Sequence, residues 1–226
     1  SDTTYISKFN EKDDDNAYVG FKYGTPGSNK YEATHANTNK STILTNLETW
    51  YNNNLSTYEK LIEDTVWCND KTVTDTTYNP FPYGGNATGL GYGTNKTYYG
   101  ASQRLVSTSG HTGGTGPSLK CNGELSKITS KIGLITADEI AFSGSIFSYY
   151  NCSTYLQENT GTNKWWSLSP DYFNGSYGAY VWYVKSGSLS GLTVDFNYGL
   201  RPVISLISST NVTGDGTSEN PFIVEK

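Results

Sequence analysis

The spacing of apolar residues predicts two neighbouring helices in the first third of the chain. The first helix begins at Ser41 and repeats its apolar positions at helical spacing, at Ile43, Leu44, Leu47, Trp50, Tyr51 and Leu55. The asparagines of residues 52–54 favour its end. Ser56 and Glu59 then have the spacing of a capping box, which predicts a second short helix that ends near Trp67–Cys68. We expect the two helices to pack side by side.

Two strands and a third helix are predicted outside this pair. The alternating residues 18–24 predict a strand that is closed by a turn at residues 25–28. Residues 131–135 predict a second strand. Thr136 and Glu139 form another capping box, so we expect a helix to begin there and to belong to the core.

The chain is loop-rich in its middle and β-rich in its C-terminal third. Residues 69–122 are dominated by Gly, Thr, Asn, Tyr and Pro, and a loop of this length is either functional or flexible. Further on, alternation and turn residues predict a meander of strands at residues 165–169, 179–184, 189–196, 200–206 and 222–224. We expect the last strand to pair with the first, which would bring the termini together. No repeat or boundary divides the chain, so a single domain over residues 1–226 is predicted.

Large rings occupy both alternating sets of the predicted strand at residues 180–184. Val181 and Tyr183 point to one face of the strand, whereas Tyr180 and Trp182 point to the other. If one face is buried, we expect the other to lie at or near solvent. There Tyr and Trp supply contact area at low entropic cost.

The composition indicates a recognition surface without strong charge. Charged residues make up 16% of the chain and the net charge is −5, so no basic stripe is present to bind nucleic acid. The polarity comes from Asn, Ser, Thr, Gly and 19 Tyr, which supply hydrogen-bonding groups and amphipathic rings. Some rings fill the core, and we assign Trp165 and Trp166 to it. No apolar run approaches the ~20 residues of a membrane span, so membrane attachment would need a removed or separate anchor.

The three cysteines are widely spaced and odd in number. Cys68, Cys121 and Cys152 contain no C-x-x-C pair, which disfavours a zinc knuckle or a redox motif. In an oxidising compartment we favour a disulfide between Cys68 and Cys121, because both flank loop-rich stretches. Three reduced thiols are the equally weighted alternative.

The residue types that catalysis requires are scarce. His35 and His111 are the only histidines and are interpreted as turn residues, and neither a G-x-S-x-G nor an H-E-x-x-H motif occurs. Asp138 and Glu139 are explained by helix capping. We therefore expect no enzyme activity and no cofactor. The acidic residues 12–16 favour a solvated turn, with a structural calcium site as the alternative.

Several motifs together resemble a family of bacterial and phage surface proteins. They are Trp165–Pro170, the aromatic hairpin after it, Gly199–Leu206, the tail Gly214–Phe222, the helix from Ser41 to Tyr51 and the segment Gly133–Glu139. That family has a C-type-lectin fold of the formylglycine-generating-enzyme (sulfatase-modifying) subtype. It includes the variable proteins of diversity-generating retroelements, in which reverse-transcriptase-driven mutagenesis rewrites a C-terminal cassette. The resemblance implies a loop-rich α+β ligand-binding domain with N-terminal helices and a C-terminal β-meander.

The matching cassette on this sequence runs from about Trp165 to Arg201. The ligand-binding positions carried over from the motif are Asp171, Tyr172, Asn174, Tyr177, Tyr180, Trp182, Lys185, Ser188, Ser190, Thr193, Asp195, Asn197 and Tyr198. The implied partner is a protein or glycan ligand on another cell or phage. The implied location is extracellular, on a cell surface or on a phage virion, and the oligomeric state stays open.

The resemblance does not extend to the enzymes of the family or to calcium-dependent lectins. The enzymes rely on a pair of cysteines near the C-terminal end, whereas the last cysteine here is Cys152. Calcium-mediated sugar binding uses a Glu-Pro-Asn or Gln-Pro-Asp triplet, and neither occurs. Two rival functions remain: a pilin-like or surface-layer subunit whose rings make subunit contacts, and a degenerate enzyme of this family or a carbohydrate-processing domain.

Overall fold

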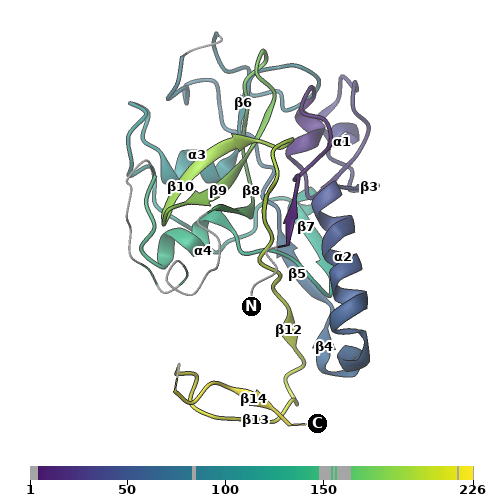
Figure 1. Cartoon of the computed structure of the whole chain (residues 1–226). Coiled ribbons are helices and arrows are strands. Elements are labelled where there is room, and N and C mark those ends of the chain that lie inside the picture. Colours follow the sequence, from purple (N-terminus) through teal and green to yellow (C-terminus); the bar gives the residue numbers. More distant parts are fainter. Residues whose placement is uncertain are drawn as a thin grey trace.

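A six-stranded mixed sheet forms the centre of the molecule (Figure 1). The computed structural model describes residues 5–82, 85–147, 154, 156, 164–217 and 219–225. The sheet consists of β1 (Ile6–Ser7), β6 (Thr97–Tyr98), β8 (Lys164–Phe173), β9 (Ala179–Lys185), β10 (Ser188–Thr193) and β11 (Tyr198–Gly199). Its order is β1-β11-β8-β9-β10, and β6 pairs with the far end of β8.

Helices and short strand pairs surround this sheet. The helices are α1 (Tyr31–Thr34), α2 (Thr42–Asn54), α3 (Gly100–Leu105) and α4 (Ala137–Phe142), with the 3-10 helices η1 (Asn16–Val19), η2 (Ser56–Leu61) and η3 (Glu124–Ser126). The remaining strands are β2 (Lys22–Tyr23), β3 (Asn39–Lys40), β4 (Ile62–Glu63), β5 (Thr65–Cys68), β7 (Lys127–Ser130), β12 (Ser205–Leu206), β13 (Val212–Thr213) and β14 (Ile223–Val224). This mixture of helices and sheets confirms the predicted α+β class.

The predicted C-terminal meander is the β8–β9–β10 part of the sheet. Consecutive strands pair antiparallel, and a two-residue turn joins β9 to β10. Ser186 and Gly187 form this turn with φ values of 49° and 82°, the left-handed conformation that suits the twist of a tight hairpin. The register between β8 and β9 shifts on both sides of Pro170, which has no N–H to donate to the ladder. β10 ends the sheet on this side.

Apolar clusters cover both faces of β9. Val181 and Tyr183 belong to one cluster, which also contains the buried residues of α2. Trp182 and Val184 belong to a second cluster, which contains residues of α3 and α4. The expectation of a wet face is therefore wrong, because α3, which forms inside the stretch predicted as loop, and α4 both pack onto this face of the sheet.

The two adjacent tryptophans of β8 are core residues, as predicted. Trp165 is 1% exposed and Trp166 is fully buried, and they lie in different clusters on opposite faces of the strand. Burial of a large apolar side chain stabilises the fold by about 2–3 kcal/mol. The pair therefore stabilises the packing of both core clusters against β8.

The helix predicted from Ser41 is confirmed as α2. The Ser41 hydroxyl accepts a hydrogen bond from the backbone N–H of Leu44 at 3.2 Å, which caps the first turn. Its buried face consists of Ile43, Leu44, Leu47 and Tyr51. The helix ends at Asn54, where the chain reaches the asparagine run.

The second predicted helix is wrong beyond its first turns. η2 covers only Ser56–Leu61, and the Ser56 hydroxyl donates to the carbonyl of Asn52 instead of capping a new helix. The chain then forms β4 and β5, and β5 pairs with β7. Val66, which lies inside the predicted helix, is 56% exposed. The β-branched residues of β5 favour a strand once β7 offers a partner.

The strand predicted at residues 18–24 is only partly correct. β2 covers residues 22–23, whereas η1 occupies residues 16–19 because the Asp15 carboxylate accepts from the N–H of Ala17 at 2.8 Å. Asp15 also accepts from Gly27 and is 5% exposed. The expected solvated turn is therefore wrong at this residue, since a buried carboxylate organises the backbone here.

The strand-to-helix step near residue 136 is confirmed at its helix and shifted at its strand. The Thr136 side chain accepts from the N–H of Glu139, whose carboxylate accepts from the N–H of Thr136, so the predicted capping box opens α4. The strand β7 lies at Lys127–Ser130, before the predicted position. Residues 131–135 contribute only a single bridge, between Gly133 and Val203.

The C-terminal end forms a hairpin of its own. β14 pairs with β13 rather than with the first strand, so the expected pairing of the two chain ends is wrong. β1 pairs instead with β11, inside the central sheet. Figure 1 shows the β13–β14 hairpin beyond β12, away from the central sheet. The preceding strand, β12, pairs antiparallel with β4.

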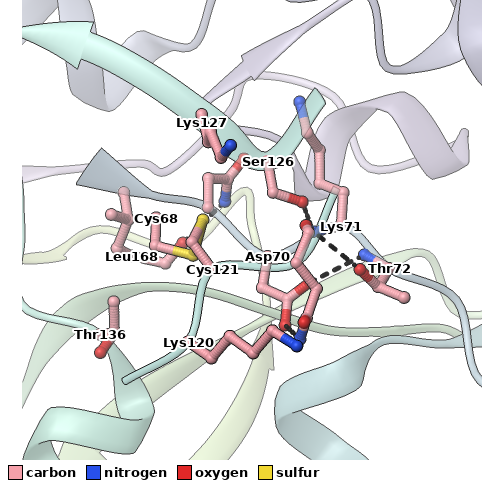
Figure 2. Close-up of a disulfide and its surroundings, with 12 residues drawn as sticks. Cys68, Asp70, Lys71, Thr72, Lys120, Cys121, Ser126, Lys127, Thr136 and Leu168 are labelled. Atoms are coloured by element: carbon pink, nitrogen blue, oxygen red, sulfur yellow. Dashed lines mark hydrogen bonds between the residues drawn. A yellow bond between two sulfur atoms is a disulfide. The ribbon is translucent and has the colours of Figure 1, made fainter. Parts of the chain in front are cut away.

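A disulfide links Cys68 to Cys121, which confirms the favoured pairing (Figure 2). It joins the end of β5 to the loop before η3, and Cys152 lies outside the described residues. Within the described parts of the chain, no helix is long and apolar enough to cross a membrane.

Candidate functional site

The structure places the carried-over positions at very different depths. Tyr177 and Asn197 are exposed, whereas Asp171, Asn174, Trp182 and Ser188 are buried. The others are half-buried: Tyr172, Tyr180, Lys185, Ser190, Thr193, Asp195 and Tyr198. Display at the surface is wrong for two of them. Trp182 is 0% exposed in the second core cluster, and the Ser188 hydroxyl donates to the Lys185 carbonyl inside the hairpin turn.

Four of these positions converge on one pocket, which we call the Asp171 pocket. It has a volume of about 280 Å³ and is lined by Phe81, Phe147, Asp171, Tyr172, Asn174, Ser190 and Gly191. The strands β8 and β10 and the hairpin turn after β8 contribute the predicted residues. The positions near β11 are not part of it, because Tyr198 stacks on Tyr183 in a separate ring cluster.

Asp171 places a buried carboxyl group in this pocket. The Ser102 hydroxyl lies 2.5 Å from its Oδ1 atom and 2.7 Å from its backbone oxygen. The carboxylate reaches Gly191 on β10, where a Cβ atom would lie only 1.9 Å from Oδ2. Any larger residue at position 191 would therefore displace the Asp171 carboxylate. Burial raises the pKa of Asp171 to about 7, and the Ser102 hydrogen bond opposes this shift.

Two further polar atoms next to Asp171 lack hydrogen-bond partners. Asn174 is 8% exposed, and its Oδ1 accepts no hydrogen bond in the described structure. The Nε1 of Trp182, which lies behind the pocket wall against Phe147, likewise has none. Leaving a buried polar atom unpaired costs about 1–3 kcal/mol, so a native structure retains such atoms only for a reason.

Stacked rings form the wall beside the carboxyl group. Tyr98, Tyr172 and Tyr180 stack in series, with ring centroids 5.4 Å and 4.3 Å apart. The opposite wall contains Phe81 and Phe147, whose centroids lie 6.0 Å apart. The Tyr98 hydroxyl donates to the Phe81 carbonyl at 2.9 Å, which ties the two walls together. The pocket therefore combines acceptor atoms with apolar ring surface.

In a second polar cleft, beside the disulfide, the buried charged groups are paired with one another. It has a volume of about 360 Å³ and contains Arg104, which donates to Asp70 at 2.8 Å and to both oxygens of Asp138 at 2.6 and 2.8 Å. Asp138 is thus a buried ion-pair partner and not only a helix-capping residue, which corrects the sequence interpretation. Because the buried guanidinium is held by both carboxylates, we regard this cleft as structural.

The histidines do not form a catalytic group. His35 is fully buried at the end of α1, so the interpretation as a simple turn residue is wrong for it. Burial and the nearby Lys71 lower the pKa of His35 to about 3, and its Nε2 lies 2.8 Å from the Gly91 carbonyl. His111 is exposed in a loop. In the described ranges, no three His, Cys, Asp or Glu side chains are grouped to hold a metal ion.

The sequence did not predict three of the residues that line the pocket, Phe81, Phe147 and Gly191. Phe81 lies in the Pro- and aromatic-rich stretch that was interpreted as loop, and Phe147 follows α4 with no motif around it. Gly191 offered a weak signal, since a glycine inside a strand often marks the close approach of another group. Ser102, which orients Asp171, carried no signal.

No protein-family model matches the chain, and neither a curated protein nor a solved structure matches it significantly. The site is therefore interpreted from its own geometry.

Proposed function

We propose that this chain is a non-catalytic ligand-binding or adhesion domain of a cell or virion surface. In this proposal the Asp171 pocket and the rings around it hold a protein or glycan ligand. The finer fold that we propose is the C-type-lectin-like fold of the formylglycine-generating-enzyme subtype. The sequence motifs support that fold, and the α+β architecture is compatible with it.

The observation that carries the proposal is an unpaired buried acceptor, the Asn174 Oδ1, beside a buried carboxyl group in an open pocket lined by rings. The Oδ1 of Asn174 has no partner in the described structure, and Asp171 accepts a side-chain hydrogen bond only from Ser102. A ligand that donates hydrogen bonds would supply what the fold leaves out. A hydrogen bond from the ligand would offset the cost of burying the unpaired acceptor, and this gain would contribute to the binding free energy.

The size of the pocket limits what enters it. A volume of about 280 Å³ lies at the lower end of ligand pockets and suits one side chain or one sugar residue. Further contact would come from the surface beside it, where Tyr177 is 66% exposed and Tyr180 is half-buried. Rings of this kind anchor ligands at low entropic cost, and short polar side chains such as Thr193 adapt the hydrogen bonds.

The arrangement of groups favours binding over catalysis. Among the described residues that line the pocket, Asp171 is the only carboxyl group, and no histidine, lysine or cysteine accompanies it. Acid–base or nucleophilic mechanisms need a second group within hydrogen-bonding reach. A degenerate enzyme is therefore less well supported than a binding module.

A structural subunit is the second candidate, and one observation favours it. The β13–β14 hairpin leaves Phe222 and Ile223 61% and 60% exposed, and Val212 on the partner strand is 43% exposed. Such apolar exposure is typical of a surface that contacts another domain or subunit. Sedimentation of the purified chain over a range of concentrations tests this function, which predicts a concentration-dependent oligomer.

The proposed function is tested by binding of the purified domain to glycan arrays and to intact cells and phage. Tyr177→Ser and Tyr180→Ser should each weaken binding about tenfold, because a ring anchor is worth roughly 1–2 kcal/mol or more. Tyr5→Ser removes a ring of similar exposure, 48%, outside the cassette and should bind like the parent. If Tyr177→Ser and Tyr180→Ser bound as tightly as the control variant Tyr5→Ser, the proposal would be contradicted.

A further inference from the structure

The Asp171 carboxyl group has no cationic partner of its own. The residues that line its pocket include neither lysine, arginine nor histidine. The nearby cations of the described structure are engaged elsewhere: Lys96 donates to the carbonyls of Phe81 and Gly85, and Arg104 is paired with Asp70 and Asp138. A buried carboxylate is normally paired with a cation or several donors, so this pocket is electrostatically incomplete.

The groups that face Asp171 do not supply the missing charge. The titratable side chains coupled to it are Tyr78, Tyr98, Tyr172 and Tyr180. Burial raises the pKa of each tyrosine above its ordinary value, so all four are neutral at physiological pH. Among the described residues that line the pocket, ionised Asp171 is therefore the only one with a formal charge.

The rings around the carboxyl group suit a cation as well. Phe81, Phe147 and Tyr172 line the pocket, and the faces of such rings attract a cation through their quadrupole. Aromatic walls next to a carboxylate are the arrangement that binds ammonium groups, whereas a neutral hydroxyl would gain little from the rings. The Asn174 Oδ1 atom offers an additional acceptor for an N–H donor.

We propose that the Asp171 pocket receives a primary ammonium group of the ligand, which pairs with the Asp171 carboxylate and donates to Asn174 between the rings. This inference rests on the proposed function and specifies its ligand chemistry. A lysine side chain and an amino sugar both carry such a group. The two sources differ only in what surrounds the ammonium.

Matched pairs of small probes test this inference by calorimetry or by ligand-detected NMR. One pair is Nα-acetyl-lysine amide and its Nε-acetylated form, and the other is glucosamine and N-acetylglucosamine. We expect the free amine of at least one pair to bind at least about tenfold more tightly than its acetylated partner, since acetylation removes the charge. Preference for the lysine pair would indicate a protein ligand, and preference for the glucosamine pair a glycan.

Two variants distinguish a specific effect of the Asp171 carboxylate on amine binding from a general effect of net charge. Asp171→Asn keeps the shape of the side chain and should abolish the preference for the free amine. Asp64→Asn removes the same charge at an exposed position and should leave the preference unchanged. Circular dichroism of both variants controls for folding. Affinity for the amine should also fall about tenfold for each pH unit below the pKa of Asp171, because protonation removes its partner.

Several results would overturn the inference. Equal binding of amine and acetylated probes, binding that survives Asp171→Asn, or no binding by either pair would each do so. The proposed function would stand in all these cases if the domain still bound its cells or phage and lost that binding with Tyr180→Ser. If the parent domain bound neither the amine probes nor any cells or phage, both proposals would be contradicted.

Discussion

Two regions of this molecule bury polar side chains in opposite ways. In the polar hub, which we define as Asn16, Asn69 and Lys71, every side chain has several partners. Asn16 donates to the carbonyls of loop residues 92, 93 and 95 and accepts from the Tyr99 hydroxyl at 2.6 Å. Lys71 donates to two carbonyls and to the Asn37 side chain. In the Asp171 pocket, the Asn174 Oδ1 has no hydrogen-bond partner among the described residues.

The number of hydrogen-bond partners distinguishes buried polar groups that stabilise the fold from those that we propose to bind a ligand. The hub connects the N-terminal segments to the loop at residues 91–95 and to β8, since Asn69 accepts from Phe21 and donates to Leu168. Figure 2 shows Lys71 and Ser126 near the disulfide, with the N–H of Lys71 donating to the Ser126 hydroxyl at 2.9 Å. Such saturated groups contribute to stability, whereas unsaturated ones reduce it unless a partner arrives.

The largest effect is expected from Asn16→Ala. It removes three buried hydrogen bonds to backbone carbonyls and the acceptor of the Tyr99 hydroxyl, so the free energy of unfolding should fall by about 5 kcal/mol, roughly 1 kcal/mol for each bond and about 1 kcal/mol for the stranded hydroxyl. Urea unfolding followed by tryptophan fluorescence measures this loss. A decrease below about 1 kcal/mol would mean that the hub is not needed for stability.

Removal of the disulfide should have the next largest effect. Cys68 and Cys121 enclose 53 residues, and opening such a loop lowers the free energy of unfolding by up to about 4 kcal/mol. Unfolding curves of a Cys68→Ser, Cys121→Ser double variant give the value. Ligand binding at the Asp171 pocket should persist while the double variant remains folded. Loss of binding in the folded variant would contradict the separation of the two regions.

The charge of Asp171 should make stability fall as pH rises. Its pKa in the folded state is about 7, above the ordinary value of 3.8, so the folded protein prefers the protonated carboxyl group. The free energy of unfolding should therefore decrease between these two values, by about 3 kcal/mol from pH 4.5 to pH 7 relative to Asp171→Asn. Parallel pH profiles of the parent and this variant would refute the account.

The smallest effect on stability is expected from Asn174→Ala, the matched counterpart of Asn16→Ala. Its Oδ1 has no partner to lose, so the free energy of unfolding should change by less than about 1 kcal/mol. The same change should weaken ligand binding measurably. A stability loss as large as that of Asn16→Ala would show that Asn174 belongs to the scaffold.

Local sequence signals were sufficient for the elements that form without distant partners. The cap of Ser41 and the capping box of Thr136 and Glu139 mark α2 and α4 correctly. Alternation located the hairpins of the central sheet. The strand β5 was missed because its partner β7 lies some sixty residues further on, and no local pattern near Val66 indicates this pairing.

The candidate site was predictable only where the motif resemblance named its residues. Asp171, Tyr172, Asn174 and Ser190 came from the cassette, and the structure brings them together. Phe81 and Phe147 come from segments outside the cassette and are placed there by tertiary packing. Burial of Trp182 could not be foreseen either, because it depends on the packing of α3 and α4 onto the sheet.

The pKa of Asp171, measured by NMR of its side-chain carboxyl carbon, tests the central claim most directly. The account predicts a value of about 7 in the free domain and a fall on addition of the amine probe that binds, because a paired ammonium stabilises the carboxylate. A value near the ordinary 3.8 in the free domain would mean that the carboxyl group is already solvated or paired. A raised value that no amine changes would contradict the ammonium site.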